Sequence, residues 1–213
     1  MRRALVVPAA ALRKVERLLR AGGWAAEPAP RGSGGDLAAA LELGREGRAV
    51  VFVPPGARAA RSLRRILVLH EGSPTAASGI GAADEAALAS GAEIVVLHVP
   101  SLEPPPEEGS LPAPRLADHA HYDWHEWRQE FLRRFCGCSE RVSLRLEVAL
   151  GPPRETIAEQ ARRLRADLLV MTWKGDPRAG RAETLKAVAG SAPCPVLILP
   201  ERAPADDGSR ERE

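Results

Sequence analysis

Short runs of Val, Ile and Leu recur along the last two thirds of the chain and predict buried strands. These runs are Ile66–His70, Ile94–Val99, Leu144–Leu150, Leu168–Thr172 and Val196–Leu199. Continuous apolar runs of this length are typical of parallel strands that are covered on both faces. The segments between them have helical spacing, so strands and helices are expected to alternate. This alternation indicates an α/β protein with a doubly wound parallel sheet.

Four helices are expected between these strands. The first begins at Ser73 and Pro74, which are typical start residues, and ends at Gly91. The second is marked by aromatic residues at helical spacing, namely Trp124, Trp127, Phe131 and Phe135. This spacing predicts an aromatic stripe that packs on the sheet. The third helix is expected to begin at Pro152-Pro153, and the last to span Glu183–Ala189.

The first 60 residues form a smaller α/β segment. Their pattern predicts two strands and two helices, at Ala4–Val7, Ala10–Arg20, Asp36–Leu43 and Ala49–Val53. The helix, strand and glycine of residues 36–56 are spaced as in residues 155–175, which suggests a decayed repeat. We therefore expect a half-sized segment at 1–60, a main domain at 64–200 and a disordered tail at 201–213.

Composition and charge exclude several classes of protein. The chain has 213 residues, of which 45% are hydrophobic and 27% charged, as is ordinary for globular proteins. No apolar run approaches the ~20 residues that cross a bilayer, so no membrane contact is expected. The formal net charge of +2 gives no reason to expect nucleic-acid binding. Three cysteines cannot build a disulfide framework, which favours the cytoplasm.

Several short motifs carry a family resemblance. They are Gly151-Pro152-Pro153 with Ile157 and Ala161, Ala166-Asp167-Leu168-Leu169-Val170-Met171, Arg65-Ile66-Leu67-Val68 with Gly72-Ser73, Leu97-His98-Val99, and Ala192-Pro193-Cys194-Pro195-Val196-Leu197. In order and spacing, these motifs make residues 64–200 resemble the universal stress protein family. The resemblance implies a flavodoxin-like, five-stranded parallel sheet in the order 3-2-1-4-5. Ligands of such sheets bind in the crevice at the switch point, here between strands one and four.

The resemblance also implies where a nucleotide would bind. The nucleotide-binding branch of the family holds adenine by an acidic residue after strand one and by backbone at the end of strand two. A loop reading Gly-x2-Gly-x9-Gly-Ser/Thr after strand four holds the phosphates, because glycines let backbone N–H groups approach them. The matching positions in this chain are Glu71, Val99, Thr172, Gly175, Ala182 and Glu183.

The phosphate loop departs from the family pattern. Thr172 stands at the first glycine, and Ala182 and Glu183 stand at the Gly-Ser pair. A carboxylate at Glu183 near a triphosphate would cost on the order of 1–4 kcal/mol. We therefore do not expect ATP to bind in the usual family manner. The alternative is a nucleotide-binding sensor for ATP or AMP, with an altered pose held by basic residues around the loop, namely Lys174, Arg178, Arg181 and Lys186.

The segment Asp118–Glu126 is rich in possible metal ligands. If the helix has begun there, His121 and His125 lie at i and i+4 on one face, where both imidazoles can meet one zinc or nickel ion. The alternative is an exposed polar helix start. His98, at the end of the second strand, is interpreted as a packed core histidine.

The family resemblance implies a role in the stress response, and the sequence patterns favour a non-catalytic regulatory module in the cytoplasm. No Ser-His-Asp order and no paired carboxylates suggest an enzyme, although weak ATP hydrolysis belongs to the sensor alternative. The family resemblance implies a homodimer through the last strand, and Val196–Leu199 is expected to be an apolar edge that needs covering. Other protein partners are a further expectation, and a metal-binding module remains the third alternative.

Overall fold

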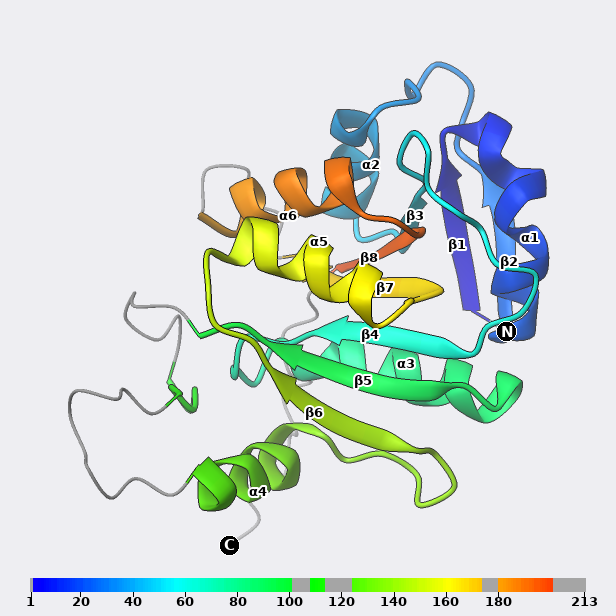
Figure 1. Ribbon diagram of the computed structural model, residues 1–213. Helices are drawn as coiled ribbons and strands as arrows, with labels where there is room; N and C mark the ends of the chain where they lie inside the picture. The colour runs from blue at the N-terminus through cyan, green and yellow to red at the C-terminus, as the bar shows by residue number, and fades with distance from the viewer. Residues whose placement is uncertain (1, 101–107, 114–123, 174–179, 201–213) are drawn as a thin grey trace, which may run out of the picture.

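In the residues that the computed structural model describes, 2–100, 108–113, 124–173 and 180–200 (180–182 as backbone only), eight strands form one sheet (Figure 1). The strands are β1 Arg2–Val7, β2 Trp24–Pro28, β3 Val50–Phe52, β4 Arg65–Leu69, β5 Glu93–His98, β6 Leu144–Val148, β7 Leu168–Trp173 and β8 Val196–Pro200. The α-helices are α1 Leu12–Ala21, α2 Leu37–Arg45, α3 Ala77–Ser90, α4 Trp124–Phe135, α5 Pro153–Arg163 and α6 Gly180–Ser191, and a 3-10 turn, Ala9–Ala11, precedes α1.

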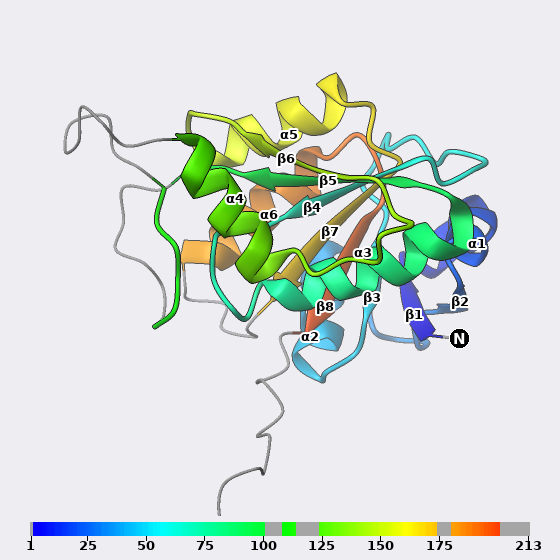
Figure 2. The same ribbon diagram turned by 90° about the horizontal axis from the view of Figure 1, so that it is seen from below.

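The sheet separates two hydrophobic cores. Helices α1, α3 and α4 cover one face, where apolar side chains such as Leu18, Ile80 and Phe131 pack together. Helices α2, α5 and α6 cover the other face, where a second apolar cluster forms (Figure 2). Each core contains residues from both the first 60 residues and the rest of the chain. The molecule is therefore a three-layer α/β structure, as the alternation of strands and helices predicts.

The sheet is larger than the five strands expected. Its order is β2-β1-β3-β8-β7-β4-β5-β6, in which the five strands predicted from the apolar runs are neighbours as β6-β5-β4-β7-β8. These five pair in parallel. The α/β class and the mostly parallel sheet are confirmed. The three further strands come from the N-terminal segment, which continues the same sheet.

Strand β2 is absent from the sequence prediction. Only Trp24 in it is large, apolar and buried, while two alanines, Glu27 and Pro28 complete the strand. Small residues and a proline are typical of an edge strand, and they give no alternating or continuous apolar pattern. Its pairing with β1 in parallel is therefore set by the tertiary structure.

Strand β8 lies inside the sheet, which corrects the expected open edge at Val196–Leu199. One side of β8 pairs in parallel with β7, and the other pairs antiparallel with β3. In the second pairing, Val51 lies opposite Leu197. The prediction was wrong about this edge because the apolar pattern of a strand does not reveal which strands flank it. A homodimer formed through this strand would need an edge that β3 already occupies.

The helices predicted from the sequence are present in the described residues, but several begin or end at other residues than predicted. The predicted aromatic stripe is confirmed in α4, where Trp127, Phe131 and Phe135 are buried. Helix α3 begins at Ala77 and not at Ser73, because the preceding residues form tighter turns in which Ala76 N–H donates to the Ser73 carbonyl at 3.2 Å. Helix α6 is longer than predicted. The expected disordered tail at 201–213 lies outside the described residues.

Candidate functional site

The carboxyl ends of β4 and β7 lie side by side in the sheet. The two strands pair in parallel along Ile66–Val68 and Leu168–Val170. From β4 the chain crosses to β5 on one side, whereas from β7 it crosses to β8 on the other. In open α/β sheets, ligands bind outside the strand ends at such a switch point. The loop that follows β4 and the end of β7 therefore form the candidate site in the described part of the chain.

Side-chain contacts hold the loop after β4. The Ser73 side chain is fully buried, and its hydroxyl donates a hydrogen bond to Glu71 Oε1 at 2.7 Å. The Ser73 oxygen also lies 3.3 Å from Thr75 Oγ1 and accepts from the Ala76 N–H at 3.4 Å. The carboxylate of Glu71, the expected adenine-end residue, is thus tied to its own loop.

Residues 108–113 pack directly on this loop. The Leu111 N–H donates to the Gly72 carbonyl at 2.8 Å, and Trp127 Nε1 of α4 donates to the Pro112 carbonyl at 2.9 Å. A Cβ at Gly72 would lie 2.7 Å from the Leu111 carbonyl oxygen, and Gly72 has a φ of 85°. Both facts require glycine there. The described part of the connection between β5 and α4, residues 108–113, therefore lies against the end of β4.

Val99 and Thr172 lie at the ends of the two strands that flank β4. Val99 directly follows β5 and is buried in the core on the face that α2, α5 and α6 cover. Thr172 lies near the end of β7, with its Cγ2 at 3.4 Å from the position of a Cβ on Gly79. The Thr172 side chain therefore faces α3, and the glycine allows this helix to pack closely on β7. Glu71, Val99 and Thr172 thus come from the ends of three neighbouring strands.

Glu183 lies in the first turn of α6 and pairs with two cations. Its carboxylate is 3.8 Å from Arg154 Nη2 of α5 and 3.3 Å from Lys186 Nζ, one turn further along α6. The N-terminal end of a helix attracts negative charge, so a carboxylate in the first turn is stabilised there. Glu183 therefore brings an anion of the protein itself to the place where the family resemblance puts phosphate.

The other predicted phosphate-loop residues are not all described. Lys174 and Gly175 lie outside the described residues, as does Arg178. Ala182 lies in the first turn of α6, where only the backbone is described.

Two buried histidines lie at the ends of β4 and β5. His98 Nδ1 lies 2.9 Å from the His70 carbonyl oxygen, and the Gly72 N–H donates to His70 Nδ1 at 3.0 Å. These contacts assign the proton to Nδ1 of His98 and to Nε2 of His70. Among the described residues, neither Nε2 atom has a hydrogen-bond partner. Phe131 of α4 contacts both rings, with centroids 5.1 and 5.3 Å away.

Burial keeps both histidines neutral. Burial, aided by the neighbouring His98, lowers the pKa of His70 from 6.5 to about 3. It also lowers the pKa of His98, against the hydrogen bond to the His70 carbonyl, which raises it. The interpretation of His98 as a packed residue agrees with this geometry, whereas no sequence pattern signalled its contact with His70.

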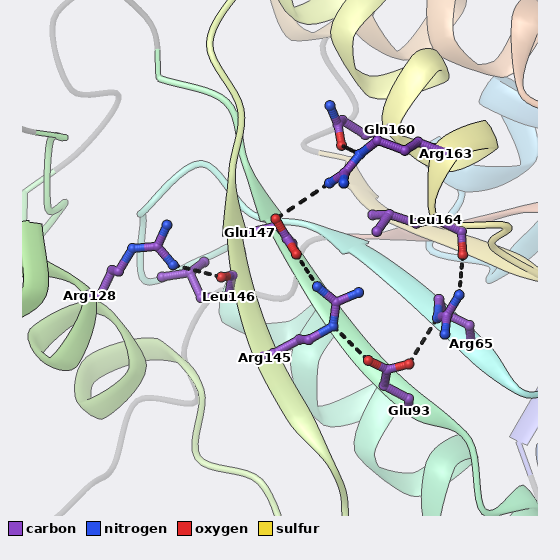
Figure 3. Close-up of polar contacts among 9 residues, drawn as sticks. All are labelled: Arg65, Glu93, Arg128, Arg145, Leu146, Glu147, Gln160, Arg163 and Leu164. Carbon is purple, nitrogen blue, oxygen red and sulfur yellow. Dashed lines mark hydrogen bonds and ion pairs between the residues drawn. The ribbon is translucent and has the colours of Figure 1, made fainter.

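Figure 3 shows a network of ion pairs across β4, β5 and β6 that the sequence analysis missed. Glu93 accepts from Arg65 Nε at 2.9 Å and from Arg145 Nε at 2.6 Å. Arg145 also contacts Glu147, whose carboxylate lies 3.5 Å from Arg163 of α5. The hydrogen bond from Arg145, aided by Arg65, lowers the pKa of Glu93. Every charge named here is paired with another side chain of the protein. We therefore interpret the network as a structural contact between neighbouring strands and not as a ligand site.

The proposed metal ligands are only partly described. His121 lies outside the described residues. His125 is exposed on α4, and its Nε2 lies 2.8 Å from Gln129 Nε2. In the described part of the chain, no group of three or more His, Cys, Asp or Glu side chains is placed to hold a metal ion. The pairing of His121 and His125 stays a prediction.

The fold and the switch point define a class: α/β proteins with a mostly parallel sheet and a switch point at the carboxyl ends of the central strands. The sequence model of the universal stress protein family matches residues 62–200, well over half of the chain. The chain therefore belongs to the universal stress protein family. Among curated proteins, the comparison gives no match. No helix in the described segments is long and apolar enough to cross a membrane.

Solved structures from the same family resemble this chain, and the first two below share its fold. A universal stress protein from Archaeoglobus fulgidus DSM 4304 is 15% identical with a TM-score of 0.52, and the match covers 73% of this chain and 50% of that one. One from Pseudomonas aeruginosa UCBPP-PA14 is 18% identical with a TM-score of 0.53, covering 93% and 82%. An Arabidopsis thaliana family member, solved with AMP bound, is 20% identical with a TM-score of 0.44, covering 67% and 97%. The chain thus spans half the length of the Archaeoglobus protein, and its likeness to the Pseudomonas protein extends into the N-terminal segment.

Proposed function

We propose that this chain is a non-catalytic regulatory module of the stress response whose crevice does not hold ATP in the usual family manner. Membership of the universal stress protein family supports the role in the stress response. The observation that carries the second part is the position of Glu183 in the first turn of α6, paired with Arg154 and Lys186. These two cations are engaged by an internal carboxylate.

A triphosphate at this position would meet two costs. Its oxygens would approach the Glu183 carboxylate, at on the order of 1–4 kcal/mol for one pair of charges about 4 Å apart. They would also compete with Glu183 for Arg154 and Lys186. The side chain of Glu183 is about half exposed, at 52%, so solvent screens both effects. At the other end of the crevice, Glu71 remains in the place of the family's acidic residue.

Titration calorimetry with ATP, ADP and AMP, each with and without magnesium, tests the proposal. The wild-type chain is expected to give no saturable heat up to millimolar nucleotide. Glu183→Ser restores the hydroxyl of the family pattern and releases both cations, so it is expected to strengthen binding about tenfold or more. Glu140→Ser removes the same charge from an exposed position on the loop before β6 and should change nothing.

Micromolar binding by the wild-type chain that Glu183→Ser leaves unchanged would overturn the proposal. It would favour the alternative of a nucleotide sensor with an altered pose, in which Lys174 and its basic neighbours replace the lost Gly-Ser pair. Release of inorganic phosphate in the same samples would reveal ATP hydrolysis. Elemental analysis of purified protein decides the metal alternative at His121 and His125.

The proposed location is the cytoplasm. It is supported by the cysteines, because Cys136, Cys138 and Cys194 are all free. Burial raises the pKa of Cys136 and of Cys194 to about 12, which keeps these thiols protonated and unreactive. A disulfide-dependent extracellular fold has no support in these residues.

A further inference from the structure

One antiparallel joint divides the described sheet into two sets of parallel strands. Strands β2, β1 and β3 are parallel to one another, and so are β8, β7, β4, β5 and β6. The two sets meet between β3 and β8, where Val50, Val51 and Phe52 lie opposite Ile198, Leu197 and Val196. We call this pairing the β3–β8 joint. It joins the N-terminal segment to the part that matches the family.

The elements on the two sides of the joint are arranged with approximate two-fold symmetry. Helix α2 leads into β3, as α6 leads into β8, and the two helices cover the same face of the sheet (Figure 1). Next outward, β1 is parallel to β3, as β7 is parallel to β8. A two-fold axis places identical strands antiparallel. A second copy's α6 and β8 would therefore pair with β8 in the orientation that α2 and β3 adopt.

The joint covers an apolar strand side of the sheet. Val196, Leu197 and Ile198 are buried, and so are Val50 and Val51 across the joint. A Cβ on Gly44 of α2 would lie 3.8 Å from Ile198 Cγ2, so this helix also packs on β8. Without β3, β8 would present unpaired backbone and apolar side chains, which is a template for pairing with another chain.

The joint is extended past β3 by polar contacts of Arg58. Its backbone N–H donates to the Pro193 carbonyl at 2.9 Å, and its guanidinium lies 3.8 Å from Asp167. The chain between β3 and β4 is therefore anchored beside the start of β8.

The two outer edges of the sheet are unsuited to pairing. On β6, Arg128 of α4 donates to the Leu146 carbonyl at 2.9 Å, and Arg145 and Glu147 carry charge onto the strand (Figure 3). On β2, the strand ends in Pro28, and the preceding Glu27 lies 3.8 Å from Arg3. Charged residues, a capped carbonyl and proline are typical protections of edge strands. Self-association through the sheet is thus left to β8.

We infer that β8 is a self-pairing edge that residues 2–53 of the same chain fill in place of a second copy, so that the full chain is a monomer. The inference does not depend on whether the crevice binds nucleotide. It replaces the expected homodimer through Val196–Leu199 with an intramolecular counterpart of that contact.

Cysteine cross-linking of the full chain tests whether β3 of the same chain or a second copy occupies the β8 edge. In a background with Cys136→Ser, Cys138→Ser and Cys194→Ala, the first variant carries Val51→Cys and Leu197→Cys, and the second carries Leu197→Cys alone. The Ala49 carbonyl and the Val53 N–H form hydrogen bonds with β1, so the backbone groups of Val51, midway between them, also point towards β1 and away from β8. Val51 and Leu197 are therefore a non-hydrogen-bonded pair of the antiparallel joint, with Cα atoms about 4.5 Å apart. This spacing is compatible with a disulfide.

Under mild oxidation, the double variant is expected to form an intrachain disulfide and to run as a monomer on a non-reducing gel. The Leu197→Cys variant is expected to stay uncross-linked, and the unmodified chain to sediment as a monomer at about 100 μM. An interchain disulfide in the Leu197→Cys variant would overturn the inference. It would be overturned most directly if the unmodified chain also sedimented as a dimer.

A second arm opens the joint. The backbone N–H of Val50 points towards β8, because the backbone groups of the residues on either side of it point towards β1. Val50→Pro therefore removes one N–H from the joint. Combined with Leu197→Cys, it is expected to give an interchain disulfide and a doubled mass. Leu18→Ala with Leu197→Cys lowers the stability of the shared core without removing a backbone N–H from the joint, and it should remain monomeric. If hydrogen exchange shows β8 exposed in the proline variant while the protein stays monomeric, β8 is not a self-pairing edge. If the proline variant fails to fold, the cross-linking of the native chain still decides who occupies the edge.

Discussion

The N-terminal segment and the part of the chain that matches the family use the same β–α units but differ in what each can bury. Residues 62–200 contribute five strands and four helices, and residues 2–53 contribute three strands and two α-helices. Leu18 and Val6 share one core with Ile66 and Val68, while Phe52 shares the other with Ile198. The smaller segment therefore completes cores that the larger one begins. Sequence similarity to a family can end at a residue where the hydrophobic core continues.

The largest expected effect tests whether the two regions unfold together. Leu18→Ala in α1 and Leu168→Ala in β7 each remove a fully buried side chain from the same core. Each is expected to lower the free energy of unfolding by about 2–5 kcal/mol. Because the core is shared, urea denaturation followed by circular dichroism should show a single transition in both variants. Two separate transitions in Leu18→Ala would contradict the shared core and indicate that residues 2–53 unfold alone.

The second effect is the loss of stability in acid, which is expected to come from the family-matched region and not from the N-terminal segment. All five histidines follow residue 60, and the buried pair His70 and His98 belongs to the family-matched region. The pKa of His70 falls from 6.5 to about 3 on folding, so the unfolded chain binds more protons between these values. Stability is therefore expected to fall as the pH drops from 6.5 towards 3. The slope is about 1.4 kcal/mol per pH unit for each histidine that stays neutral in the folded chain.

His70→Asn and His98→Asn test this slope. An asparagine can accept at the place of His70 Nδ1 and donate at the place of His98 Nδ1, but it does not titrate. Urea denaturation at pH 4 to 7 should show a flatter profile for each variant, by up to the slope of one proton. His125→Asn on the exposed side of α4 is the control. An unchanged profile in both buried variants would show that other groups cause the acid sensitivity.

The smallest effect concerns a helix start beside the β3–β8 joint. The Asp36 side chain accepts a hydrogen bond from the Ala39 N–H at 2.9 Å and caps α2, whereas the N-cap residue of α5, Pro152, makes no side-chain cap. Asp36→Ala should lower the free energy of unfolding by about 1 kcal/mol, and Asp36→Asn by less, because asparagine keeps the acceptor. Thermal unfolding measures both, and equal losses would refute the capping role.

Local sequence patterns predicted most of the helices and strands. The aromatic stripe of α4 follows from spacing alone, since residues three or four apart share one side of a helix, and Trp127 and Phe131 are buried accordingly. The five apolar strands follow from their continuous runs. The start of α3 was misplaced because Ser73 and Pro74 are equally suited to a tight turn, which is what the loop after β4 requires. Strand β2 was missed because alanine and proline carry no strand signal at an edge.

The candidate site was less accessible to sequence reasoning. Motif spacing located Glu71, Val99 and Thr172, which stand at the ends of neighbouring strands. The ion pairs of Glu183 with Arg154 and Lys186 join two helices and depend on how α5 and α6 pack. The contact between His70 and His98 joins residues 28 positions apart on adjacent strands. No local pattern encodes such distances.

Short-range periodicity and motif spacing were sufficient for most of the secondary structure, the family and the position of the switch point, because each of these depends on residues close together in the chain. The place of β8 inside the sheet, with β3 beside it, became visible in the folded chain alone. An apolar strand has the same pattern whether its neighbour is its own chain, a second copy or water. The path of the backbone selects the partner, since hydrogen bonds between strands use groups that nearly every residue shares.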